Sequence, residues 1–328
     1  MIITRTPFRM SFFGGGSDLP AYFKNHGGAV LSTSINKYVY INFHQKFNSG
    51  LRIAYSNIEE VTHVNDVRHP IVKNTLNYFR ISGGFEISSI ADIPSKGSGL
   101  GSSSSYTVGL IKAISEYQNL LLSTKEIAEL ACYIEIELCG DPIGKQDQYA
   151  AAFGGFNVFR FSTDGTTTVH PLNLSSSFLH YISASLVSVY TGNVRNAASI
   201  LKEQSEAVGT GEKASIQSRI VSFVDRGTDL LLSENLSEFG QLLDESWQLK
   251  KQLSDKISNA HVDEIYAIGM RAGAWGGKLL GAGMGGFITF IVDPKKCNDV
   301  KNALSGYQIV ELVPELSGHK LLHNSMGN

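Results

Sequence analysis

The chain has 328 residues, of which 42% are hydrophobic and 18% are charged, and its formal net charge is -2. This length suffices for two domains of ordinary size, and the nearly balanced charge gives no electrostatic reason for binding nucleic acid or an anionic membrane. Three cysteines without metal-type spacing, an N-terminus without a signal-type apolar core and no run as long as a membrane span favour a cytoplasmic protein with reduced thiols.

The first elements in chain order are extended segments around a glycine-rich turn. Residues 2–13 predict a strand, and the turn that follows contains three glycines, a serine and an aspartate: Gly14, Gly15, Gly16, Ser17 and Asp18. Considered alone, Asp18 is more typical of a turn or cap residue than of a ligand. Residues 29–43 and 84–90 are rich in β-branched and aromatic side chains and predict further strands.

The most informative stretch is residues 94–105, where three glycines at alternate positions precede four serines. Glycines at such positions can adopt positive φ and let the backbone approach a ligand closely. The next residues carry apolar side chains at Val108, Ile111 and Ile114, which is the spacing of one helix face. Because the free N–H groups at a helix start attract anions, this pattern predicts a phosphate-binding loop rather than a linker. It is not a Walker A loop, since no Gly-Lys-Ser/Thr closes it.

A second helix is predicted after the capping box formed by Ser123 and Glu126, and it should end before Pro142. Glu135 and Glu137 flank its apolar stripe on opposite sides, each roughly 80° from the centre at about 100° per residue. Periodicity therefore does not distinguish between these two carboxylates. The polar cluster around Asp147 that follows is typical either of placed catalytic groups or of a solvated turn.

The polar stretch between residues 162 and 177 predicts a domain boundary, and we divide the chain into residues 1–172 and 173–328. The second half predicts a strand at 182–190, helices over about 195–255 and 261–272, and strands at 287–292 and 307–313. Helices and strands are mixed in both halves, which indicates an α+β or α/β class. A late dinucleotide-type glycine pattern opens a strand instead of a helix, so it favours a loop that lines a ligand cleft over a Rossmann site.

Three separated stretches, residues 7–18, 94–105 and 277–287, together resemble the GHMP kinases. They occur in the family's order, and Asp147 lies between the second and the third. Within that family the wording of residues 5–20, 99–105 and 142–155 is most similar to the D-glycero-D-manno-heptose 7-phosphate kinases.

The resemblance implies an α+β fold of two domains. The N-terminal domain would resemble ribosomal protein S5 domain 2, the C-terminal domain would be ferredoxin-like, and the site would lie between them. The implied activity is ATP- and Mg²⁺-dependent phosphorylation of the anomeric hydroxyl of a heptose 7-phosphate, which makes a 1,7-bisphosphate for nucleotide-activated heptose in polysaccharide biosynthesis. The alternatives are a kinase for an unphosphorylated sugar such as L-fucose, or a GHMP-fold protein that binds ligand without catalysis. A homodimer is compatible with the sequence, although no feature of it indicates one.

The resemblance also implies residue roles. Asp147 would be the catalytic proton acceptor, and Arg9 would keep its carboxylate ionised. Ser103 and Glu135 would complete a Mg²⁺ site, because a hydroxyl and a carboxylate are hard oxygen ligands. The residues implied in binding the ATP phosphates are Pro94, Gly97, Gly99, Leu100, Gly101, Ser102, Ser103 and Ser104.

The sugar would bind at the first glycine turn and at the third motif. The residues implied there are Gly14, Gly15, Gly16, Ser17, Asp18 and Gly283. A phosphorylated acceptor also needs cations, and our candidates are Arg195, Lys145 and Lys96, in that order.

Two residues of the turn and one of the third motif depart from relatives. Gly15 and Gly16 replace the Glu-His pair of galactokinases, which argues against galactose as the acceptor. Met284 stands where the third motif usually has glycine, which affects how closely that loop can approach a ligand. Elsewhere, Trp247 and Lys250 lie one helix turn apart, and we expect a core residue and a solvated lysine, respectively.

Overall fold

The computed structural model describes residues 1–93, 97–192 and 211–325. Pro94, Lys96 and Arg195, which the sequence implicates in ligand binding, lie outside these ranges. Within the described ranges no helix is both long and apolar enough to cross a membrane.

The first sheet has eight strands, and its main path runs in the order β12-β1-β2-β5-β3-β4. Strand β2 is long enough to pair with β5 through its second half and with β6 through its first half, and β6 in turn pairs with β7. All neighbours are antiparallel except β3 and β5. The strands are β1 Ile2–Phe13, β2 Gly28–Gln45, β3 Leu51–Ala54, β4 Ile58–Val61, β5 Phe85–Ala91, β6 Phe156–Phe161, β7 Thr167–Pro171 and β12 Lys320–Asn324.

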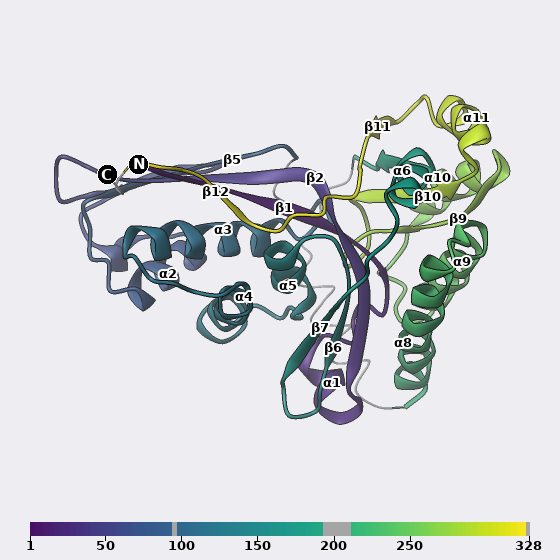
Figure 1. Cartoon of the computed structure of the whole chain (residues 1–328), viewed down its shortest axis with the longest axis horizontal. Coiled ribbons are helices and arrows are strands. Elements are labelled where there is room, and N and C mark those ends of the chain that lie inside the picture. The colour runs from purple at the N-terminus through teal and green to yellow at the C-terminus, as the bar shows by residue number, and fades with distance from the viewer. Residues whose placement is uncertain (94–96, 193–210, 326–328) are drawn as a thin grey trace.

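Helices α2 to α5 cover one face of this sheet (Figure 1). The central helix, α3, is buried along most of its length, and it is fastened to β1 by hydroxyl groups. Thr4 donates to the carbonyl of Gly109 at 2.9 Å, and Ser105 donates to the carbonyl of Pro7 at 2.8 Å. The helical elements of this half are α1 Pro20–His26, η1 Val64–Asp66, α2 Pro70–Tyr78, α3 Ser102–Tyr117, α4 Thr124–Cys132, the π-helix η2 Tyr133–Leu138 and α5 Gln146–Phe153.

The second sheet has four antiparallel strands in the order β11-β8-β10-β9. Its strands are β8 Leu186–Tyr190, β9 Ala274–Leu279, β10 Phe287–Val292 and β11 Gln308–Val310. The accompanying helices are α6 Ser176–Ala184, α8 Gly211–Leu232, α9 Leu236–Lys251, α10 Ala260–Arg271, η3 Pro294–Lys296 and α11 Cys297–Ala303. The strand predicted at 182–190 is too long, because helix α6, capped by Ser175, occupies its first residues.

Two features connect the halves of the molecule. Phe12 and Phe13, at the end of β1, pack edge-on against Phe239 of α9, with ring centroids 5.2 and 5.1 Å apart. After β11 the chain returns along the first sheet and pairs β12 with β1 (Figure 1), which brings Ser325 within a backbone hydrogen bond of Met1. The α+β class is therefore confirmed. The boundary after residue 172 stays a prediction, and a single cut there does not follow the sheets, because β12 from the end of the chain pairs with β1.

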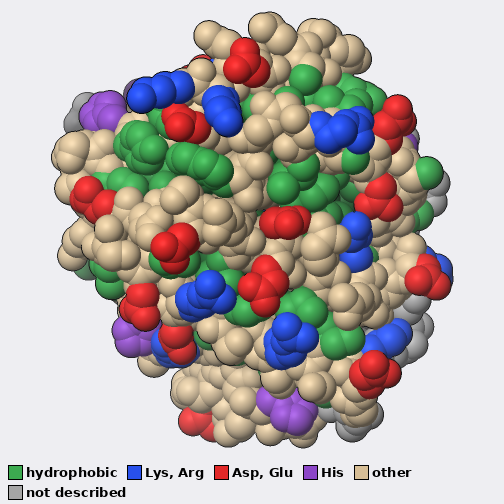
Figure 2. All heavy atoms as spheres, turned by 90° about the vertical axis from the view of Figure 1, so that its right-hand side faces the viewer, with side chains coloured by type: hydrophobic (Ala, Val, Ile, Leu, Met, Phe, Trp, Pro, Cys, Tyr) green, Lys and Arg blue, Asp and Glu red, His purple; other side chains and the backbone are tan. Residues whose placement is uncertain are grey.

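Figure 2 shows the face formed on the side of the second sheet and its helices. Acidic and basic side chains are interspersed over this face, as expected for a chain whose net charge is -2.

Candidate active site

The glycine-serine loop leads directly into α3, as the sequence predicts. Gly97, Gly99 and Gly101 have φ values of +72°, +73° and +78°, so each glycine of the alternating pattern adopts a left-handed conformation. The loop is held by β1, because the backbone N–H of Arg9 donates to the carbonyl of Leu100 at 3.0 Å. The resulting helix N-terminus presents its free N–H groups beside Ser102, as an anion site requires.

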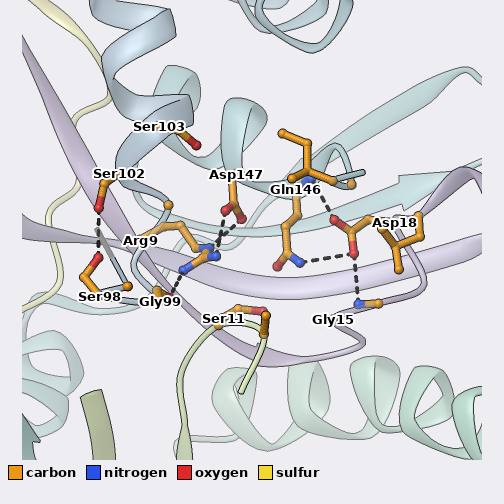
Figure 3. Close-up of a pocket in the computed structure, with 18 of the residues that line it drawn as sticks. Arg9, Ser11, Gly15, Asp18, Ser98, Gly99, Ser102, Ser103, Gln146 and Asp147 are labelled. Atoms are coloured by element: carbon orange, nitrogen blue, oxygen red, sulfur yellow. Dashed lines mark hydrogen bonds and ion pairs between the residues drawn. The ribbon is translucent and has the colours of Figure 1, made fainter. Parts of the chain in front are cut away.

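Asp147 forms a two-pronged ion pair with Arg9 (Figure 3). Nε of Arg9 lies 2.7 Å from Oδ1 of Asp147, and Nη2 lies 2.8 Å from Oδ2. The remaining Nη1 donates to the carbonyl of Gly99 at 2.6 Å. Arg9 is only 4% exposed, so one buried guanidinium fastens the carboxylate of α5 to the phosphate loop. Such planar bidentate pairing fixes the carboxylate's orientation.

Asp18 is buried and lines the same pocket, and it also closes the first glycine turn. Its Oδ1 accepts from the N–H of Gly16 at 2.9 Å and from Nε2 of Gln146 at 3.1 Å, and its Oδ2 accepts from the N–H of Gln146 at 3.2 Å (Figure 3). Burial raises the pKa of Asp18, and the nearby charge of Asp147 raises it further. The first glycine turn and the start of α5 are therefore joined through this carboxylate.

One pocket brings together ten of the residues implied by the sequence: Arg9, Gly15, Gly16, Asp18, Gly97, Gly99, Gly101, Ser102, Ser103 and Asp147. Others support it from behind. The hydroxyl of Ser17 donates to the carbonyl of Ala29 at 2.9 Å, and a side chain at Gly14 would collide with that same carbonyl. Leu100 and Ser104 are buried beneath the loop.

The third glycine stretch packs against the phosphate loop. A Cβ added to Gly281 would lie 2.4 Å from the Cα of Gly99, so the two loops are in backbone contact. Gly283 instead contacts the backbone of Ile257 and is not among the residues that line the pocket. Met284 keeps a glycine-like φ of +64°, and its N–H donates to the carbonyl of Ile257 at 3.0 Å.

Glu135 lies behind the loop and is fully buried, whereas Glu137 is exposed. Oε2 of Glu135 accepts from Nε2 of Gln148 at 2.7 Å, while Oε1 of Glu135 has no hydrogen-bond partner among the described residues. Burial raises the pKa of Glu135 to about 7, although the hydroxyls of Ser104 and Ser103 partly oppose this effect. An unsatisfied buried carboxylate oxygen beside Ser103 fits a hard cation such as Mg²⁺.

Three lysines are placed differently from the expectations. Nζ of Lys145 donates to the carbonyl of Gly165 at 2.7 Å, and Lys145 is not among the residues that line the pocket. Lys250 does line it and is not a solvated lysine, so that expectation was wrong; Trp247 is a core residue, as expected. Lys278 also lines the pocket and was missed. A lysine between a glycine and a leucine in a stretch that is otherwise uncharged could have indicated that Lys278 is buried.

A second cavity of about 740 Å³ adjoins the pocket and shares Ser102 and Ser103 with it. Its walls include Tyr55, His69 and Tyr106. The ring of His69 stacks on Tyr106 with centroids 5.3 Å apart and meets Tyr55 edge-on at 4.7 Å. The sequence analysis missed this cavity, because its walls come from strands and helices that are far apart in the chain.

Comparisons with known proteins place the chain in a family. Residues 67–155 match the model of the GHMP kinases N terminal domain, and residues 228–308 match that of the GHMP kinases C terminal domain. The chain is 34% identical over 313 residues to D-glycero-alpha-D-manno-heptose 7-phosphate kinase of Campylobacter jejuni, covering 92% of both chains.

Two further relatives extend the comparison. A crystal structure described as a D-glycero-D-manno-heptose 1-phosphate kinase from Bacteroides thetaiotaomicron superposes with a TM-score of 0.83 and 27% identity, covering 99% of both chains. The bifunctional fucokinase/GDP-fucose pyrophosphorylase of Arabidopsis thaliana is 28% identical over 326 residues, which are 91% of this chain but 30% of that protein.

The chain belongs to the GHMP kinases. It is an ATP-dependent phosphotransferase that acts on an alcohol group, and it is related to the sugar kinases of that family. The family and fold implied by the three sequence motifs are thereby confirmed.

Proposed function

We propose that this kinase phosphorylates the anomeric hydroxyl of D-glycero-D-manno-heptose 7-phosphate, giving the 1,7-bisphosphate for nucleotide-activated heptose. The observation that carries the proposal is the Asp147–Arg9 pair at the phosphate loop, in a pocket that also holds Asp18. The name of the Campylobacter relative supports the choice of sugar.

In this proposal Asp147 accepts the proton of the acceptor hydroxyl as the phosphoryl group is transferred. Arg9 holds the carboxylate by both oxygens, so it fixes the direction from which the proton is taken. Phosphoryl transfer depends mainly on positioning and on charge, and this pair supplies both at the edge of the loop. Asp18 and Gln146, which are hydrogen-bonded to each other, would offer a carboxylate and an amide to the sugar hydroxyls.

The nucleotide would span both cavities. The apolar and aromatic walls of the second cavity suit a nucleoside, and Ser102 and Ser103, which line both spaces, mark where the phosphates would cross to the acceptor. Ser103 and Glu135 would hold Mg²⁺ there, and the bound ion would neutralise part of the phosphate charge. The unsatisfied Oε1 of Glu135 supports this assignment.

A kinase for free L-fucose is the alternative, and the match to the plant fucokinase over 91% of this chain favours it as the second candidate. The two functions differ in whether the acceptor already carries a phosphate.

The test is ³¹P NMR of the protein with Mg²⁺-ATP and one acceptor per sample: the heptose 7-phosphate, L-fucose, mannose or galactose. We expect a new anomeric phosphate signal, together with ADP, in the heptose 7-phosphate sample alone. Turnover with a free sugar alone would replace the proposed acceptor but keep the kinase. The absence of ADP formation with every acceptor would contradict the proposal.

A further inference from the structure

The pocket contains two lysines that the proposed mechanism does not use. Lys250 is in the last turn of α9, and Lys278 is in β9 and only 6% exposed. Both line the same pocket as Arg9, Asp18 and Asp147. They come from the second sheet and its helices, whereas the phosphate loop and the first glycine turn come from the first half of the chain.

Each ammonium group is oriented by one backbone carbonyl. Nζ of Lys250 donates to the carbonyl of Gly281 at 2.6 Å, and Nζ of Lys278 donates to the carbonyl of Phe12 at 2.8 Å. An ammonium group has three N–H donors, so among the described residues each lysine keeps two without a protein partner. Gly281 packs on Gly99 of the phosphate loop, so Lys250 contacts the loop that packs on the phosphate loop, and Lys278 contacts the end of β1.

Neither lysine forms an ion pair with a carboxylate within the described ranges, since the partner of each is a backbone carbonyl. Arg9 is already paired with both oxygens of Asp147. Asp18 acts on Lys250 from a distance but forms no ion pair with it in the part of the chain that the structure describes. Burial and the charge of Arg9 together lower the pKa of Lys250 to about 8, although Asp18 partly opposes this effect. Burial holds the pKa of Lys278 well below its usual range, and the charges of Lys250 and Arg9 lower it further. An anion that binds beside the two amino groups would therefore stabilise their charged forms.

We propose that Lys250 and Lys278 form a phosphate-binding pair in the active-site pocket. A phosphate group carries up to two charges and several acceptor oxygens, so it can satisfy both ammonium groups together. Two phosphates could occupy the pair in this enzyme: the phosphate that the acceptor already carries, or the γ-phosphate of the nucleotide. The first source rests on the proposed function, and the second requires only that the protein be a kinase.

The test compares the full-length protein with Lys250→Met and Lys278→Met variants by isothermal titration calorimetry. Each source is examined with a matched pair of ligands. Heptose 7-phosphate against free heptose reports on the acceptor phosphate, and β,γ-imido-ATP against ADP reports on the γ-phosphate. We expect both variants to weaken the phosphate-bearing member of one pair by about 10- to 100-fold, because charge-assisted hydrogen bonds are lost. The other member should change less than about threefold.

Lys251→Met is the matched control, because Lys251 directly follows Lys250 in the chain but is not among the residues that line the pocket. The ammonium group of Lys251 is instead paired with Asp263 at 3.3 Å. This control variant should leave all four affinities unchanged. Methionine replaces the buried amine by an apolar chain of similar length. The unfolding temperature of the Lys278→Met variant should therefore equal or exceed that of the parent. A Lys250→Arg variant provides a second check, since it keeps the charge and should recover part of the affinity.

Two outcomes would overturn the proposal: unchanged affinity for both phosphate-bearing ligands, or equal weakening of a ligand and its counterpart that lacks the phosphate. The proposed function can fail separately. If the parent protein neither binds nor phosphorylates heptose 7-phosphate, that function is wrong, and the nucleotide pair of ligands alone decides whether the lysines bind phosphate.

Discussion

The side chains that surround Asp147 leave it one conformation. Its two oxygens are held by Arg9, whose third donor group is held by the phosphate loop, so the carboxylate cannot turn without breaking several charge-assisted hydrogen bonds. A proton acceptor needs this kind of fixed direction toward the reacting hydroxyl.

Replacing Asp147 by asparagine should lower kcat by about 10²- to 10⁴-fold, because the side chain loses its ability to accept the proton. The KM for ATP should stay within about threefold of the parent value, since no contact to the nucleotide is removed. A coupled assay of ADP release measures both constants. Asp299→Asn, at an exposed position in α11, is the control and should change neither. Turnover of the Asp147→Asn protein within a few-fold of the parent would contradict its assignment as the base.

Glu135 predicts a pH dependence of stability. Its pKa is about 7 in the folded protein against an ordinary value of 4.5, so the folded state binds a proton that the unfolded state has released between these values. The free energy of unfolding should therefore fall as the pH rises through this window, by up to about 1.4 kcal/mol per pH unit.

The Glu135→Gln variant should lack this part of the slope and be more stable than the parent above pH 7 when Mg²⁺ is absent. Glutamine keeps an oxygen that can accept from Gln148 but carries no charge to desolvate. Urea denaturation at intervals from pH 5 to pH 8 measures the difference. Parallel profiles for parent and variant would mean that Glu135 is ionised throughout.

At the scale of elements, the π-helix η2 decides which glutamate is buried. The N–H of Cys139 donates to the carbonyl of Ile134 at 2.9 Å, five residues earlier, so this turn is wider than an α-helical turn. A widened turn shifts the side chains out of the 3.6-residue period. It buries Ile134 and Glu135 together and leaves Glu137 exposed, which a calculation based on α-helical geometry cannot reproduce.

The contact between the two glycine loops predicts a strong effect of a small substitution. Gly281 has a φ of +81° and its position lacks space for a Cβ, so Gly281→Ala should push the third glycine stretch away from Gly99. We expect a loss of about 1–3 kcal/mol in stability, together with weaker binding of β,γ-imido-ATP, from urea denaturation and calorimetry. Gly306→Ala is the control, since a Cβ there would meet no atom within 4 Å. Equal behaviour of the two variants would show that the loops do not depend on each other.

At the scale of the whole molecule, one hydrophobic core runs through both sheets. Phe239 lies at the junction, where it meets Phe12 and Phe13 of β1. The site is assembled at this junction, because the lysines of α9 and β9 share a pocket with residues of the first half.

Phe239→Ala should therefore destabilise the entire molecule by about 3–5 kcal/mol, because a large buried ring is removed from the junction. Urea denaturation of the parent should show one cooperative transition, and the variant should show the same transition at a lower midpoint. Phe47→Ala, at a fully exposed position, should change the free energy of unfolding by less than about 0.5 kcal/mol. Two separate transitions in the parent would instead mean that the halves unfold independently.

The sequence by itself determined the features that depend on local backbone chemistry. Alternating glycines permit positive φ, and a helix with an apolar face follows them, so the phosphate loop could be recognised without knowledge of the fold. Ser123 and Glu126 form the predicted capping box, for the same local reason. The order of three glycine motifs was enough to identify the family.

Only the tertiary structure decided which distant groups meet. The return of β12 to the first sheet, the aromatic cavity beside the loop, and the entry of Lys250 and Lys278 into the pocket all join segments separated by many residues. A π-helical turn, which the pattern of apolar residues does not reveal, decides that Glu135 and not Glu137 is buried. Periodicity records which face of an element is buried, whereas a site depends on what the faces of different elements bring together.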